Sequence, residues 1–112
     1  MLKFLDPILV VKLNQLVLKE NPTILKPELL GNWNSSLPYL DSIYLQISCI
    51  VRSVVKNHYF SDGNKRTAVL VLVSCCREFN LKLPNKDIDI KILEIANNNY
   101  SIEKVSLLLF GK

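Results

Sequence analysis

Apolar residues recur at helical spacing in several stretches of the chain, and polar or proline-containing segments separate these stretches. The clearest stretch is residues 39–57, where apolar side chains return every three or four positions, as on one face of an α-helix. Residues 6–20 show similar spacing and predict a first helix. The packing face of this first helix is expected to contain Leu9, Leu13, Leu16 and Val17, and to be widened by Val10, Val11 and Leu18.

Residues 64–79 are apolar on almost every side, which is typical of a helix buried in the middle of a bundle. The run 68–73 also suits a buried strand, because β-branched residues favour strands. A helix is preferred, since the segment before Asn80 is long enough for about four turns. Asn80 is expected to end this helix in a left-handed conformation. Two shorter helices are predicted after it, over residues 86–97 and 102–110.

Residues 21–38 interrupt the pattern with Pro22, Pro27, Pro38 and a run of polar residues, so only irregular structure or a short helical turn is predicted there. The whole pattern predicts an all-α fold: a single domain over residues 1–112, with five or six helices. Composition agrees, because 49% hydrophobic and 21% charged residues are typical of a chain that folds around an apolar core.

Charge and hydropathy limit the classes of partner and location. A formal net charge of +4 favours acidic partners such as nucleotides, but the lysines are scattered, so direct nucleic-acid binding is not expected. The longest unbroken apolar run, residues 68–73, is far shorter than the roughly 20 residues that span a bilayer, and no signal peptide is recognisable. A cytoplasmic protein without membrane association is therefore predicted.

The three cysteines, Cys49, Cys75 and Cys76, fall inside apolar helical patterns, which predicts reduced, buried thiols. Cys75 and Cys76 are adjacent and point to different helix faces, so their spacing does not resemble a paired-ligand zinc site. No structural zinc is therefore expected.

A short polar segment, N-H-Y-F-S-D-G-N-K-R-T-A at residues 57–68, joins the two longest predicted helices. It contains the only histidine, His58, which can accept a proton near neutral pH. Asp62 supplies a hard oxygen ligand of the kind that Mg²⁺ takes beside substrate phosphates. The segment therefore offers a general base and a metal ligand close together in the sequence.

The same segment also predicts a phosphate site. Gly63 and Asn64 favour a tight turn, so the next helix is expected to begin there with unpaired N–H groups at the positive end of its dipole. Lys65 and Arg66 add two cations. Singly, these features are common in ordinary caps, turns and solvated charges. A base, a metal ligand and a phosphate site within nine residues favour group transfer from a nucleoside triphosphate to a hydroxyl.

The segment 58–68 resembles the signature His-x-Phe-x-(Asp/Glu)-Gly-Asn-x-Arg of the Fic/Doc superfamily. Its ending, N-K-R-T-A, is similar to the death-on-curing (Doc) toxin branch. Val69 stands where Fic adenylyltransferases carry a second arginine, which favours the Doc type, whereas Gly63 is the Fic form of a position at which Doc has alanine. The resemblance covers most of the chain from about residue 39 onward.

The resemblance to Doc implies an all-α Fic/Doc bundle and a toxin of a toxin–antitoxin system in bacterial cytoplasm. The implied activity is transfer of phosphate from ATP, with Mg²⁺, to a threonine of translation elongation factor Tu, which arrests translation. His58 would take the proton of the attacking hydroxyl and Asp62 would hold Mg²⁺. The residues that would bind the nucleotide phosphates are Gly63, Asn64, Lys65 and Arg66, and Arg66 would also act in catalysis.

Two further expectations come from the resemblance. In Fic/Doc proteins a flap before the core helix receives the target, and by position this flap would be residues 29–37. Its middle would contain Gly31, Asn32, Trp33 and Asn34. A surface loop anchored by Trp33 is the equal alternative. The (Ser/Thr)-x-x-x-Glu-(Gly/Asn) helix of self-inhibited Fic enzymes is not matched, because Leu16 stands four residues before Glu20. Inhibition in trans by an antitoxin is therefore expected.

Two alternatives to phosphate transfer remain. The same base, metal ligand and phosphate site would serve transfer of AMP, which differs only in the phosphate that is attacked. A non-enzymatic module whose anion site docks a nucleotide or an acidic peptide would need the helix start but neither the base nor Mg²⁺.

Overall fold

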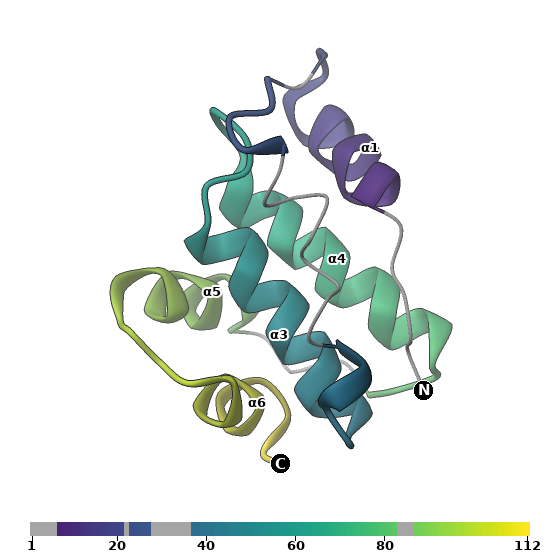
Figure 1. The fold of residues 1–112 in the computed structure, drawn as a ribbon, viewed down its shortest axis with the longest axis vertical. Coiled ribbons are helices and arrows are strands. Elements are labelled where there is room, and N and C mark those ends of the chain that lie inside the picture. The colour runs from purple at the N-terminus through teal and green to yellow at the C-terminus, as the bar shows by residue number, and fades with distance from the viewer. Residues whose placement is uncertain (1–6, 22, 28–36, 83–86) are drawn as a thin grey trace.

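The computed structural model describes residues 7–21, 23–27, 37–82 and 87–112 (Figure 1). Every regular element in these ranges is helical, apart from one isolated antiparallel bridge between Ile24 and Phe60. The α-helices are α1 (Pro7–Leu18), α3 (Ile43–Lys56), α4 (Asn64–Glu78), α5 (Ile88–Asn97) and α6 (Ile102–Phe110), and a 3₁₀ helix, η1, covers Leu37–Tyr39. The predicted all-α fold is confirmed. The predicted flap residues Gly31, Asn32, Trp33 and Asn34 lie outside the described ranges, so the flap stays a prediction.

Helices α3 and α4 lie side by side at the centre of the molecule (Figure 1). Helix α1 packs on α4, while α5 and α6 pack on the other side, against α3. Because α4 contacts α1, α3 and α5, its apolar residues are needed on several sides, as the sequence predicted. No helix in the described part of the chain is both long and apolar enough to cross a membrane.

Helix α3 begins later than the sequence predicted, at Ile43 instead of residue 39. Ser42 caps it, accepting a hydrogen bond from the Tyr44 N–H at 3.1 Å. The preceding residues form η1, and the buried side-chain amide of Gln46 donates to the carbonyls of Leu37 and Leu40 at 3.0 and 3.3 Å. These bonds satisfy carbonyls that a longer α3 would have paired internally, so the chain turns before the helix starts.

The predicted packing face of α1 is wrong in part. Leu16 is 69% exposed and Leu9 is 37% exposed, whereas Val10 and Asn14 are fully buried. Most positions of α1 are apolar, so hydrophobic spacing alone could not select the buried side. The side that faces α4 has a polar residue, Asn14, at its centre.

Three described helices end at a non-glycine residue with a left-handed backbone. These residues are Lys19 after α1, His58 after α3 and Asn80 after α4, with φ angles of 58°, 50° and 53°. The prediction for Asn80 is confirmed. At the C-terminal helix α6, Ser101 accepts a hydrogen bond from the Lys104 N–H and Gly111 follows the last turn with φ of 71°.

The three cysteines are buried, as predicted. The pKa of Cys75 is raised to about 12, mainly by burial and in the same direction by the neighbouring Cys76 and Glu78. Burial also raises the pKa of Cys76. These thiols therefore stay protonated at neutral pH, which makes them poor nucleophiles and poor metal ligands.

Candidate active site

The loop between α3 and α4, residues 57–63, is called the motif loop here. Its buried residues are Tyr59 and Phe60, each 1% exposed, and its exposed residues include His58 and Asp62 on either side of them. The two aromatic rings anchor the loop in the core. The proposed base and the proposed metal ligand are thereby held at the surface on a rigid support.

His58 follows the last turn of α3 in a left-handed conformation, with φ of 50°. Glycine is the usual residue at such a position, because a side chain there costs about 1–2 kcal/mol. The imidazole is exposed to solvent. A strained, exposed histidine at a helix end is typical of a residue that serves a site instead of the fold.

Two sets of hydrogen bonds shape the motif loop. On one side, the Leu25 N–H donates to the Tyr59 carbonyl at 2.7 Å, and the Ser61 N–H donates to the Thr23 carbonyl at 3.0 Å. On the other side, the Asn64 side chain accepts from the Phe60 N–H at 3.2 Å and donates to the Phe60 carbonyl at 2.9 Å. Asn64 was expected to bind phosphate through its side chain. In the structure this side chain folds the loop back onto the first turn of α4.

The start of α4 is open. Its capping residue is Gly63, which has no side chain to accept a hydrogen bond, and no acidic residue lies in the first turn. The N–H groups of Asn64, Lys65 and Arg66 have no partner among the residues that the structure describes. The side chains of Lys65 and Arg66 are exposed and form no ion pair with those residues. Two cations at the positive end of a helix are unfavourable by themselves and become favourable when an anion binds.

The N–H of Gly63 is already used. It donates to Oδ1 of Asp62 at 2.7 Å, so in this conformation it does not contribute to the expected phosphate site. The other carboxylate oxygen of Asp62 has no hydrogen bond within the described ranges, and the side chain is exposed. Asp62 therefore offers one free, hard oxygen at the start of α4.

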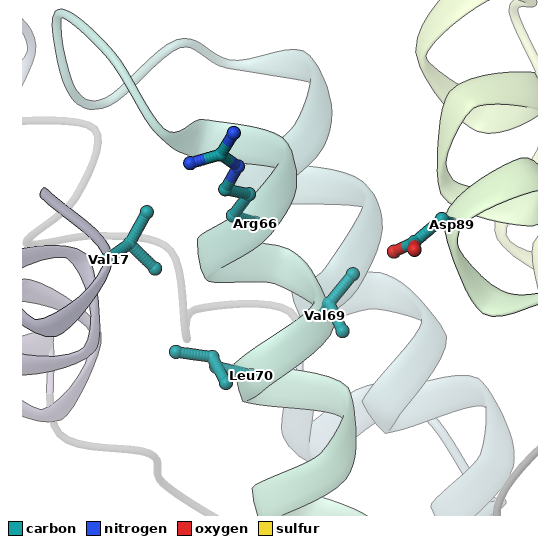
Figure 2. Close-up of a pocket in the computed structure, with 5 residues that line it drawn as sticks. All are labelled: Val17, Arg66, Val69, Leu70 and Asp89. Atoms are coloured by element: carbon teal, nitrogen blue, oxygen red, sulfur yellow. The ribbon is translucent and has the colours of Figure 1, made fainter.

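A groove of about 280 Å³ lies between the end of α1, the first turns of α4 and the start of α5 (Figure 2). It is lined by Val17, Arg66, Val69, Leu70 and Asp89. Figure 2 shows Arg66 on the first turn of α4, the apolar side chains beyond it, and the carboxylate of Asp89 on the α5 side. The groove therefore has a cation at one end, an apolar wall and a carboxylate on the far side. Val69, which stands at the position of the second Fic arginine, belongs to this wall.

One buried contact that reaches the motif loop was missed in the sequence. Asn14 of α1 donates through Nδ2 to the Asp62 carbonyl and to Oγ1 of Thr67, both at 3.0 Å, and Asn14 and Thr67 are fully buried. The signal that could have found Asn14 is its position between Val10 and Val17, at helical spacing on an otherwise apolar face. A buried polar side chain there needs a partner on the facing helix.

A model of the Fic/DOC family matches residues 10–76, which is more than half of the chain and includes both α1 and the motif loop. The chain belongs to the Fic/DOC family. Members of this family generally transfer nucleotide-derived groups to proteins, and they use nucleoside triphosphates, usually with Mg²⁺. Comparison with curated proteins and with solved structures gave no match.

The donor set of this Fic/DOC chain fits Mg²⁺ bound together with a nucleotide. The described residues contain no group of three histidine, cysteine or acidic side chains that could form a complete protein cage. The exposed carboxylate of Asp62, beside the open start of α4, suits a cation that keeps most of its ligands as water and phosphate oxygens.

Proposed function

We propose that this protein transfers the terminal phosphate of ATP to a serine or threonine hydroxyl of a protein target, as the Doc-like toxin of a toxin–antitoxin system. The observation that carries this proposal is the open start of α4, where unpaired N–H groups and the unpaired cations Lys65 and Arg66 follow directly on Asp62. The expected target, by resemblance, is elongation factor Tu in the bacterial cytoplasm, with arrest of translation as the result.

The phosphates would lie at the Arg66 end of the groove, since the carboxylate of Asp89 repels them from the other end. The nucleoside would then rest against the apolar wall formed by Val17, Val69 and Leu70. Asp62 would hold Mg²⁺, which, when bound, neutralises charge on the phosphates. This arrangement accounts for a groove that is cationic at one end only.

His58 would act as the general base. Its exposed imidazole can accept the proton of the attacking hydroxyl as the oxygen approaches the phosphorus. Lys65 and Arg66 would balance the charge that spreads over the phosphoryl oxygens during transfer. Asn64 and Gly63 keep the motif loop and the start of α4 in register through the bonds described above.

Transfer of AMP is the second candidate, and two observations bear on it in opposite directions. The apolar Val69 leaves Arg66 as the one arginine lining the described groove, which favours the Doc type. Gly63, the Fic form of its position, favours the Fic type. A Cβ there would lie 3.1 Å from Cγ1 of Val17 and 3.2 Å from Nδ2 of Asn14, so the alanine found in Doc would require these side chains to move by a few tenths of an ångström.

Labelled ATP distinguishes these candidates. The protein is incubated with a bacterial lysate and Mg²⁺, with label on either the γ- or the α-phosphate, beside the His58→Ala variant. Phosphate transfer predicts γ-label on a lysate protein, no α-label, and loss of the signal in the variant. Stable α-label would instead establish AMP transfer. No label from either nucleotide would favour the binding module.

Regulation is proposed to come from a separate antitoxin protein. Leu16, which stands where a self-inhibited Fic enzyme needs serine or threonine, is exposed on α1. Co-expression with neighbouring open reading frames should therefore relieve growth arrest and yield a stable complex. Persistent toxicity with every neighbouring protein would contradict this part of the proposal.

A further inference from the structure

One buried amide connects α1 to both sides of the Asp62–Gly63 turn. The Nδ2 group of Asn14 donates to the carbonyl oxygen of Asp62 and to the hydroxyl oxygen of Thr67, which lies in the first turn of α4. The asparagine is fully buried. Its contacts therefore reach the residue before the helix cap and a residue after it.

Stability alone does not explain this asparagine. Its Oδ1 atom is buried without a hydrogen-bond partner in the described part of the chain. An unpaired buried acceptor costs about 1–3 kcal/mol, which offsets much of what the two hydrogen bonds from Nδ2 contribute. The amide is thus placed at some expense where it holds the Asp62 carbonyl.

The bond from Asn14 acts on a single rigid unit. The carbonyl of Asp62 and the N–H of Gly63 belong to the same planar peptide group. Asn14 holds the carbonyl end of this plane, and the N–H end donates to Oδ1 of the Asp62 carboxylate at 2.7 Å. Fixing the plane from α1 therefore also fixes the carboxylate on its other side. The close approach of Val17 and Leu18 to Gly63 leaves the plane little freedom to turn.

We propose that Asn14 is a positioning residue for Asp62. It orients the Asp62–Gly63 peptide so that one carboxylate oxygen is occupied by the Gly63 N–H and the other is presented to the Mg²⁺ of a bound nucleotide. This inference rests on the proposed function in one respect, namely that Asp62 holds Mg²⁺. The orientation of the peptide by Asn14 can be tested without it.

The experiment compares Asn14→Leu with Thr67→Val. The leucine removes both hydrogen bonds of Asn14, whereas the valine removes only the one to Thr67 and leaves the Asp62 carbonyl bonded. Calorimetry measures the affinity of each variant for ATP with and without Mg²⁺. Nuclear magnetic resonance reports the amide signal of Gly63, and denaturant unfolding measures stability. If leucine is not accommodated, Asn14→Ala makes the same deletions without added volume.

In Asn14→Leu, affinity for ATP with Mg²⁺ should fall about 10-fold or more, as is common when a residue that orients a metal ligand is lost. Affinity for ATP without Mg²⁺ should change little, and the Gly63 amide signal should shift upfield as its bond to the carboxylate weakens. Thr67→Val should keep wild-type values for both.

Two results separate the inference from the proposed function. If the wild-type protein binds ATP equally with and without Mg²⁺, the role of Asp62 is wrong, yet the Gly63 signal still tests the orientation. If the wild type depends on Mg²⁺ but Asn14→Leu matches it in both affinity and Gly63 signal, the inference is overturned.

Discussion

Helices α4 and α6 both begin after a polar turn, yet their first turns are built in opposite ways. At α6, the side chain of Ser101 accepts from the Lys104 N–H, and Glu103 places a negative charge at the positive end of the dipole. At α4, the cap is a glycine, no acid is present, and two cations stand there instead. The first turn of α6 is completed by its own residues, whereas that of α4 leaves N–H groups open to an anion.

A similar contrast separates two pairs of cations, Arg52 and Lys56 on one side and Lys65 and Arg66 on the other. On the α3 side, Arg52 donates to the Tyr100 carbonyl at 2.6 Å, and Lys56 donates to the Ala96 and Asn98 carbonyls at 3.2 and 2.8 Å. These charges join α3 to α5 and to the turn before α6. Lys65 and Arg66 have no such partners in the described residues. Positive charge therefore supports the fold on one side and remains available to a ligand on the other.

The largest expected effect comes from His58→Gly, paired with Lys19→Gly. Both residues end a helix with a left-handed backbone, so glycine relieves similar strain in each. Both variants should stay within about 1 kcal/mol of wild-type stability, because relief of strain and added unfolded-state entropy oppose each other. Transfer from labelled ATP should fall about 10²–10⁴-fold in His58→Gly only. If Lys19→Gly lost transfer activity to the same extent, both substitutions would act through the fold, and His58 would not be the general base.

Gly63→Ala and Gly111→Ala form the next pair. Both glycines have left-handed φ, of 75° and 71°, so each alanine should cost about 1–2 kcal/mol. A Cβ at Gly111 meets nothing within 4 Å, whereas one at Gly63 meets Val17, Asn14 and Leu18. Crowding should add about 1–3 kcal/mol to the cost at Gly63. Denaturant unfolding measures both, and equal costs would mean that α1 does not press on the motif loop.

The end of α4 opposite the motif loop contains a buried thiol whose protonation makes stability depend on pH. At the far end, the pKa of Cys75 is raised by burial to about 12, from an ordinary value of 9.0. Above about pH 9 the unfolded thiol releases its proton and the folded one does not, so stability should fall by up to about 1.4 kcal/mol per pH unit. Unfolding measured from pH 8 to 10.5 should show a shallower fall in Cys75→Ala. An equal loss of stability with pH in wild type and Cys75→Ala would contradict the burial of a neutral thiol at this position.

The smallest expected effect is a gain. Lys65→Glu replaces a cation in the first turn of α4 by an anion, which should stabilise the free protein by about 0.3–1 kcal/mol at low salt. The same change should weaken ATP binding at least about tenfold, equivalent to about 1.4 kcal/mol.

Lys104→Glu is the control for the loss of ATP affinity, because it makes the same change of charge in the first turn of α6. It should alter stability slightly and leave ATP affinity unchanged. A loss of stability in Lys65→Glu, or an ATP affinity equal to wild type, would argue against an anion site at α4.

The sequence predicted the helices well where one pattern dominated. The spacing of apolar residues in α3 and the turn chemistry of Gly63 and Asn80 left few alternatives. The sequence did not predict the buried side of α1, because apolar residues occupy most positions of this helix and lie on all its sides. It also placed the start of α3 too early, since the spacing of apolar residues does not indicate the hydrogen bonds of Gln46 to the Leu37 and Leu40 carbonyls.

At the site, the residue types of the motif predicted which side chains gather between α3 and α4. Their hydrogen bonds were not predictable. The side chain of Asn64 and the N–H of Gly63 are both engaged within the loop, which no spacing rule indicates. The contact of Asn14 with Asp62 joins residues 48 positions apart and exists only because α1 packs on α4.

The most direct test of an anion site at the start of α4 is a titration with ATP and Mg²⁺, followed through the backbone amide signals. The account predicts that the signals of Asn64, Lys65 and Arg66 move most, while those at the start of α6, residues 102–104, stay in place. Unmoved signals at Asn64, Lys65 and Arg66, or equal movement at both helix starts, would contradict it.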